Sequence, residues 1–380
     1  MYTAGVHARA LIPLCALLLL AACGDDRDPA TGSDAATASE SSDASASSDA
    51  TTQHSSSADP SGDATQSETA TSSGSGSSGD ASDTDPPDTT EDPSTTGDSG
   101  EAPPLGCGHA APAPGWLPGN TVEVDGETRE YALFIPSGYD PGEPTSLVLN
   151  FHGLLGNPLQ QADFSQFNDT AEARGLVVAY PVGIGNSFNA GACCGTAHSE
   201  GVNDILFARL LVDKLLGELC VDPRRVYVTG MSNGGHMAHT LACRAADVFA
   251  ASASVAGVLG LAPADCQPSR PISMLDFHGT GDLIVSYNGA GPGYPAVQPM
   301  MQGWAARDGC DGASEVSFQK DDMTCETWPN CADGVEVTLC TIDGGGHCWP
   351  GNDSCLFGAS STALHASEAI ADLFAQHTLP

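Results

Sequence analysis

Basic residues are scarce in this sequence. Its 380 residues include 12 lysines and arginines against 48 aspartates and glutamates, for a formal net charge of −36. A surface this acidic repels phosphate groups, so we expect no binding to nucleic acid or to anionic lipid headgroups. Aromatic residues are also few, at 6%, which argues against a broad sugar-binding face.

Long hydrophobic runs are missing as well. The apolar run Ala10–Leu20 follows the basic start His7 and Arg9 and is too short to cross a bilayer. It predicts a secretory signal peptide over residues 1–22. The run ends in Leu-Ala-Ala-Cys23, which resembles a bacterial lipobox, so we expect Cys23 to be lipidated. The alternative is ordinary cleavage after Ala22, with an incidental cysteine.

Apolar residues are almost absent from the next segment, residues 23–106, which is rich in serine, threonine, aspartate, alanine and glycine. Such a chain cannot bury enough apolar surface to offset the entropy lost on ordering, so it is predicted to be disordered. Its acidic residues repel each other and extend it. We interpret this segment as a tether that holds a domain away from a membrane. The lipid on Cys23 is expected to be the protein's contact with that membrane. The expected location is the outer membrane or cell surface, with secretion or the periplasm as alternatives.

Zinc-type cysteine spacing is also missing, because no CxxC pair is matched by a second pair or by paired histidines. The chain has 14 cysteines. Cys15 would leave with the signal peptide and Cys23 would carry lipid. The even number that remains in an exported chain indicates disulfides. We expect the neighbours Cys193 and Cys194 to bond to two different partners, since a bond between adjacent residues strains the peptide.

Residues 107–380 fit one α/β domain. An Asp125-Gly126 turn between two strand-like runs predicts an opening hairpin. Apolar strand signals then alternate with helical ones, which favours a mostly parallel sheet covered by helices on both faces. The predicted strands are 121–124, 131–135, 146–151, 175–180, 225–229, 251–256, 272–277 and 335–342. The predicted helices are 201–219, 235–246, 300–307 and 361–377.

The strongest chemical motif is Gly230-Met-Ser232-Asn-Gly234. It follows a predicted strand and opens a helix, which is the context of a nucleophile elbow. The tight turn exposes the serine hydroxyl, and the helix N-terminus favours developing negative charge. We therefore predict Ser232 as a nucleophile. A structural Gly-Ser turn is the alternative.

A serine hydroxyl needs a base and an orienting carboxylate. His347 lies in a glycine-rich turn beyond the last predicted strand, whereas His236 and His239 on the elbow helix are expected to be surface or packing residues. Asp282 follows the strand 272–277, at the strand end where the site of a parallel sheet lies. We predict Asp282 as the acid; Asp276 is its rival, but it would point into the sheet.

Two backbone donors are needed for the oxyanion. We expect one from Asn233, directly after the nucleophile, and the other from Leu154, in the loop after the strand ending at Phe151. His152 is expected to hold that loop in place. Trp349, beside His347, is predicted either to stack on a sugar or phenolic ring of the substrate or to shield the triad.

Together these motifs resemble those of a known enzyme family. The region after the tether resembles the polyhydroxybutyrate depolymerase and feruloyl esterase-like family of α/β hydrolases, which are relatives of carbohydrate esterases. The matching segments are Asn150–Gly153, Asn189–Gly195, Gly230–Gly235, His278–Asp282 and Gly345–Gly351. The resemblance implies an α/β-hydrolase fold, an acyl-serine mechanism, no metal and no organic cofactor. It also implies export and ester substrates that are polymeric or attached to polymers.

The expected function is that of an exported serine carboxylic-ester hydrolase, a feruloyl or acetyl esterase on plant polysaccharide. The first alternative is a polyhydroxybutyrate depolymerase, although no appended polymer-binding module is evident. The second is an inactive cell-surface binding protein on a hydrolase fold, since a fold alone does not give a function. We expect a monomer.

Overall fold

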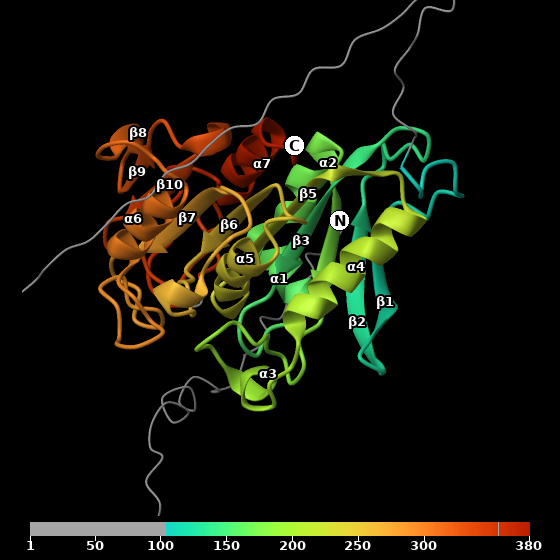
Figure 1. Cartoon of the computed structure of the whole chain (residues 1–380), viewed down its shortest axis with the longest axis horizontal. Helices are drawn as coiled ribbons and strands as arrows, with labels where there is room; N and C mark the ends of the chain where they lie inside the picture. The colour runs from blue at the N-terminus through green and yellow to red at the C-terminus, as the bar shows by residue number, and fades with distance from the viewer. Residues whose placement is uncertain (1–103, 356) are drawn as a thin grey trace, which may run out of the picture. The chain divides into compact units, whose positions relative to one another are not determined.

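The computed structural model describes residues 104–380 except 356 (Figure 1). The predicted signal peptide, Cys23 and the tether up to residue 103 lie outside these residues. The strands are β1 (Gly115–Val124), β2 (Glu127–Ile135), β3 (Thr145–Phe151), β4 (Val177–Pro181), β5 (Val221–Met231), β6 (Ala251–Val255), β7 (Ser273–Gly279), β8 (Glu315–Lys320), β9 (Met323–Trp328) and β10 (Val337–Ile342). The helices are α1 (Pro158–Ser165), α2 (Phe167–Arg174), α3 (Gly195–Ser199), α4 (Asp204–Glu218), α5 (Asn233–Arg244), α6 (Val297–Arg307) and α7 (Ala366–Gln376).

The ten strands form one sheet in the order β1-β2-β4-β3-β5-β6-β7-β10-β9-β8. Pairing is parallel from β4 through β10 in this order and antiparallel at both edges. The predicted opening hairpin is present: β1 pairs with β2, and both turn residues, Asp125 and Gly126, have positive φ. In Figure 1 this hairpin lies at one end of the sheet and β8 and β9 lie at the other.

Helices cover both faces of the sheet because its central strands are apolar on both sides. On β3, Leu147, Leu149 and Phe151 join the core under α4, α5 and α6, whereas Val148 joins the core under α1, α2 and α7. All four side chains are buried. Figure 1 shows α4 and α5 crossing in front of the sheet. Because the central strands are parallel, their carboxyl ends meet at one edge, where the loops after β3, β5, β7 and β10 lie.

This arrangement is an α/β-hydrolase fold, so the predicted fold class is confirmed. The elements that prediction missed have weak signals. β8 is mostly exposed and has only two apolar residues, Val316 and Phe318, and α1 and α2 are about two turns long with few apolar residues. A sign of α1 was present in the sequence, since Asn157 caps it through Gln160 N–H and Pro158 follows. Among the described residues, no helix is long and apolar enough to span a membrane.

The described cysteines are paired in six disulfides, and one expectation about them is wrong. Cys193 and Cys194 bond to each other, not to separate partners. The two Cα atoms lie 3.1 Å apart across a cis peptide, which leaves the two sulfurs within bonding reach of each other. The other bonds are Cys107–Cys220, Cys243–Cys266, Cys310–Cys331, Cys325–Cys340 and Cys348–Cys355.

Asp308, directly after α6, should make the stability of the fold depend on pH. It is fully buried, and burial raises its pKa from 3.8 to about 7 although Ile272 N–H donates to it. The folded state therefore holds this proton more tightly than the unfolded chain, and the stability gained is lost as pH rises from about 4 through about 7. Asp308→Asn, which keeps the acceptor for Ile272, should be about 1–3 kcal/mol more stable than the wild type at pH 8.

Urea unfolding at pH 5 and pH 8 checks this, with the exposed Asp265→Asn as control. The advantage of Asp308→Asn should be smaller at pH 5. An equal free energy of unfolding for wild type and variant at pH 8 would contradict the assignment.

Candidate active site

Ser232 occupies a sharp turn between β5 and α5. Its φ is 57° and its ψ is −119°, a conformation that is costly for a residue with a side chain. The flanking glycines make the turn possible. A Cβ on Gly230 would lie 2.5 Å from the carbonyl oxygen of Gly234, and one on Gly234 would lie 2.1 Å from the carbonyl oxygen of Phe151. The turn is fixed by Ser232 N–H, which donates to Val255 O at 2.9 Å, and Ser232 remains partly exposed.

The loop after β3 packs directly against this turn. A Cβ on Gly153 would lie 3.3 Å from Ser232 Cβ, so the peptide before Leu154 passes next to the serine. His152 is buried and accepts from Gly183 N–H through Nε2, while Nδ1–H donates to Gly153 O at 2.7 Å. Burial lowers the His152 pKa to about 4. This neutral imidazole holds the loop, in agreement with the expectation for His152.

Asp282 and His347 meet at the same edge. His347 Nδ1–H donates to Asp282 Oδ2 at 2.7 Å, and the N–H groups of Ile284 and Val285 donate to Oδ1. Burial alone would raise the Asp282 pKa, but the His347 contact and the two amides hold it below its usual range. Because Nδ1 of His347 carries the proton toward Asp282, Nε2 is left as the basic nitrogen.

Glycines also bring the acid and histidine loops together. A Cβ on Gly279 would lie 2.1 Å from Gly345 O, and Gly281 N–H donates to Gly345 O. His347 N–H donates to Phe357 O, and the Cys348–Cys355 disulfide ties together the chain that follows His347 and the chain that leads to Phe357. His347 is therefore held by a backbone hydrogen bond and a neighbouring disulfide, and it is 5% exposed.

Behind Asp282 lies a buried layer that the sequence reasoning missed. His278 Nε2–H donates to Val285 O at 2.8 Å and lies 3.6 Å from Asp282 Oδ2, while its Nδ1 lies 3.8 Å from Asp276 Oδ2. Burial opposes a charge on His278, yet the two carboxylates and the carbonyl raise its pKa. His278 therefore lies between two carboxylates that favour its protonated form. The histidine was visible in the His278–Asp282 motif, but its role depends on contacts that spacing does not reveal.

Asp276, the rival acid, is held on the far side of this layer. Trp304 Nε1–H donates to His239 Nδ1, so the His239 proton lies on Nε2, 3.4 Å from Asp276 Oδ1. Asp276 is fully buried and its neighbours are His239 and His278. His239 is therefore a buried residue, as is His236, whose Nδ1–H donates to Ser232 O. Burial lowers the His236 pKa to about 4, so His236 is neutral.

Trp349 does not lie where a substrate ring could stack on it. The side chain is 1% exposed, belongs to the core under α7, and donates through Nε1–H to Ser367 Oγ. The structure thus corrects the expectation of a stacking contact, because packing against α7 covers the indole.

Apolar side chains are exposed on each loop of the site. Leu155 follows the Gly153–Leu154 segment, Leu283 and Ile284 follow Asp282, and the backbone of Phe357 pairs with His347. Leu283 is 92% exposed and Leu155 is 64% exposed. These four residues are the exposed large apolar side chains on the loops that carry the site residues.

Comparison with known proteins places this geometry in a family. The model of the family described as esterase PHB depolymerase matches residues 129–276. Feruloyl esterase B of Piromyces equi is 35% identical over 234 residues, which cover 58% of this chain and 42% of that protein. Putative esterase NocK of Nocardia uniformis subsp. tsuyamanensis is 31% identical over 278 residues, which cover 66% of this chain and 80% of that one.

This chain thus spans less than half of the length of Feruloyl esterase B. Among solved structures, the acetyl xylan esterase from Aspergillus awamori aligns with a TM-score of 0.47 at 16% identity, over 65% of this chain and 94% of that one. The assignment of this chain to a family rests on the sequence relatives and not on the solved structure. The chain belongs to the polyhydroxybutyrate depolymerase and feruloyl esterase-like family of esterases.

Proposed function

We propose that this protein is a serine carboxylic-ester hydrolase in which Ser232, His347 and Asp282 form the catalytic triad. The observation that carries the proposal is the 2.7 Å bond from His347 Nδ1 to the buried Asp282, at the sheet edge where the strained turn presents Ser232. Family membership supports the reaction class, because the matched relatives are named as esterases.

The tautomer of His347 determines which of its two ring nitrogens acts as the base. His347 Nε2 accepts the Ser232 proton as Oγ attacks the ester carbonyl, and Asp282 stabilises the imidazolium that forms. The N–H groups of Asn233 and Leu154 donate to the oxyanion. His347 then returns the proton to the leaving alcohol, and water hydrolyses the acyl-serine by the same steps. The N-terminus of α5 adds a favourable dipole for the negative charge.

The substrate that we propose is a feruloyl or acetyl ester of plant polysaccharide. Relatives named feruloyl esterase and acetylxylan esterase/xylanase support it. The exposed Leu155, Leu283, Ile284 and Phe357 suit a phenolic acyl group better than acetate, since an aromatic ring buries more apolar surface. The same side chains and the matched family description also favour a second candidate, a polyhydroxybutyrate depolymerase.

We also propose that the protein is exported. Six disulfides among the described residues suit an oxidising compartment. Lipidation of Cys23 stays a prediction, since Cys23 lies outside the described residues.

Replacing the nucleophile tests the reaction class. Ser232→Ala should abolish hydrolysis of p-nitrophenyl acetate without loss of folding, because the acyl-enzyme can no longer form. Initial rates and a circular dichroism melt measure the two properties. Retained turnover in a folded variant would rule out the proposed triad.

A pair of variants tests which carboxylate is the acid. Asp282→Asn should lower kcat by about 10²–10⁴-fold, because the asparagine favours the wrong imidazole tautomer. Asp276→Asn preserves the Asp282–His347 bond and should keep kcat within about tenfold of the wild type. If Asp276→Asn is as damaging as Asp282→Asn while still folded, the acid has been misassigned.

A substrate panel tests the proposed specificity. We expect kcat/KM to be highest on methyl ferulate when it is measured beside acetylated xylan and a hydroxybutyrate oligomer. Leu283→Asn should lower kcat/KM on methyl ferulate by about tenfold but leave p-nitrophenyl acetate unchanged, because one buried apolar side chain contributes roughly 1.5–3 kcal/mol. Val316→Asn, an exposed site on β8, is the matched control. Preference for the oligomer would favour the depolymerase, and an equal loss on both esters for Leu283→Asn would exclude a specific role for Leu283.

A further inference from the structure

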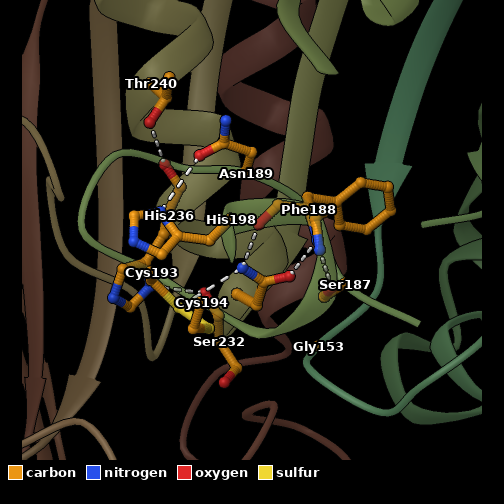
Figure 2. Close-up of a disulfide and its surroundings, with 12 residues drawn as sticks. Gly153, Ser187, Phe188, Asn189, Cys193, Cys194, His198, Ser232, His236 and Thr240 are labelled. Carbon is orange, nitrogen blue, oxygen red and sulfur yellow. Dashed lines mark hydrogen bonds between the residues drawn. A yellow bond between two sulfur atoms is a disulfide. The ribbon is translucent and has the colours of Figure 1, made fainter. Parts of the chain in front are cut away.

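The Cys193–Cys194 disulfide lies beside the proposed nucleophile, in a segment that the mechanism above does not use. Figure 2 shows the sulfurs next to the turn that carries Ser232. Cys193 is 3% exposed, and its Sγ accepts from the side-chain amide of Asn233 at 3.4 Å. The disulfide is therefore in contact with the residue that follows the nucleophile.

The Asn233 side chain clamps this segment to the elbow. Its Oδ1 accepts from Phe188 N–H at 2.7 Å, and its Nδ2 donates to Phe188 O at 2.9 Å as well as to Cys193 Sγ. Asn233 is buried, so these bonds are shielded from water. The backbone N–H of the same residue is one of the two proposed oxyanion donors.

The other side of the segment packs against the second donor's residue. A Cβ on Gly195, directly after the disulfide, would lie 2.8 Å from Leu154 Cδ1 and 2.7 Å from Ser187 Cβ. Next along the same loop, Leu155 N–H donates to Asn186 O at 2.8 Å, and Asn186 Nδ2–H donates to Gly156 O. The segment 186–195 thus contacts the side chains of both residues that carry the donors, and it bonds to the N–H of Leu155, the residue after Leu154.

The segment is itself fixed by two anchors outside it and by one hydrogen bond within it. Asn189 N–H donates to Asp204 Oδ2 at 2.7 Å, and Asp204 is paired with Arg129 in a buried salt bridge. Ala192 N–H donates to Gly260 O, and Ala190 N–H donates to Cys193 O. The disulfide joins the two side chains nearest the site into one ring, which removes their independent rotation.

We propose that the Cys193–Cys194 disulfide and the Asn233 side chain are positioning groups that brace the two oxyanion donors, the N–H groups of Asn233 and Leu154. The inference rests on the proposed function. Oxyanion donors act through preorganisation, since a donor that must move into place during the reaction loses part of its effect. A brace that holds both donor residues through their side chains would therefore lower the barrier without touching the substrate.

The test is the double variant C193S/C194S, with C310S/C331S as the matched control for loss of a disulfide. On p-nitrophenyl acetate, C193S/C194S should lower kcat by about tenfold relative to the control, with KM within about twofold. The inhibition constant of phenylboronic acid, which forms a tetrahedral adduct on the nucleophile, should rise by a similar factor. A purely structural role would change stability but leave both quantities at the control values.

Asn233→Ala provides a second route if C193S/C194S does not fold. It keeps the backbone donor and the disulfide but removes the clamp, so the same parallel loss in kcat and boronate affinity is expected. The brace is overturned if folded variants differ from the control by less than about threefold in kcat, or if the loss lies in KM. If Ser232→Ala retains activity, the proposed function fails first; if Ser232→Ala is inactive but the brace variants match the control, the brace alone is wrong.

Discussion

The close approach of three backbones around Ser232 is the constraint on which the site depends. The start of α5 lies so close to the end of β3 that a Cβ on Gly234 would collide with the carbonyl oxygen of Phe151. A Cβ on Gly230 would in turn collide with the carbonyl oxygen of Gly234. This contact forces the serine into its strained conformation, and it brings the loop after β3 beside the nucleophile. The extensive buried core on both faces of the sheet offsets the cost of that strain.

The ionisable residues around this turn differ in charge according to their surroundings. Asp282 is kept ionised by two backbone amides and by His347, and His278, whose pKa is raised by Asp276 and Asp282 against the effect of burial, lies behind it. The neutral His152 and His236 hold the backbone near Ser232 and add no charge. Neutral imidazoles thus hold the backbone around the nucleophile, while His278 lies between two carboxylates behind the acid.

Much of this was predictable from sequence. Apolar runs predicted the central strands because these are buried on both faces, and glycines around Ser232 and His347 marked turns that side chains would block. Contacts between distant segments were not predictable. Spacing could not show that His278 lies between two carboxylates, that α7 covers Trp349, or that Cys193 and Cys194 bond to each other. β8 and α2 were not predicted because both are short and contain few apolar residues.

The central claim, that Ser232 is a nucleophile activated by His347, is tested most directly by mapping a covalent adduct. The protein should be treated with a fluorophosphonate, digested, and sequenced by tandem mass spectrometry. The account predicts one phosphonylated site, on Ser232, and loss of esterase activity in proportion to labelling. A modified residue elsewhere, or an unlabelled protein that still hydrolyses esters, would contradict it.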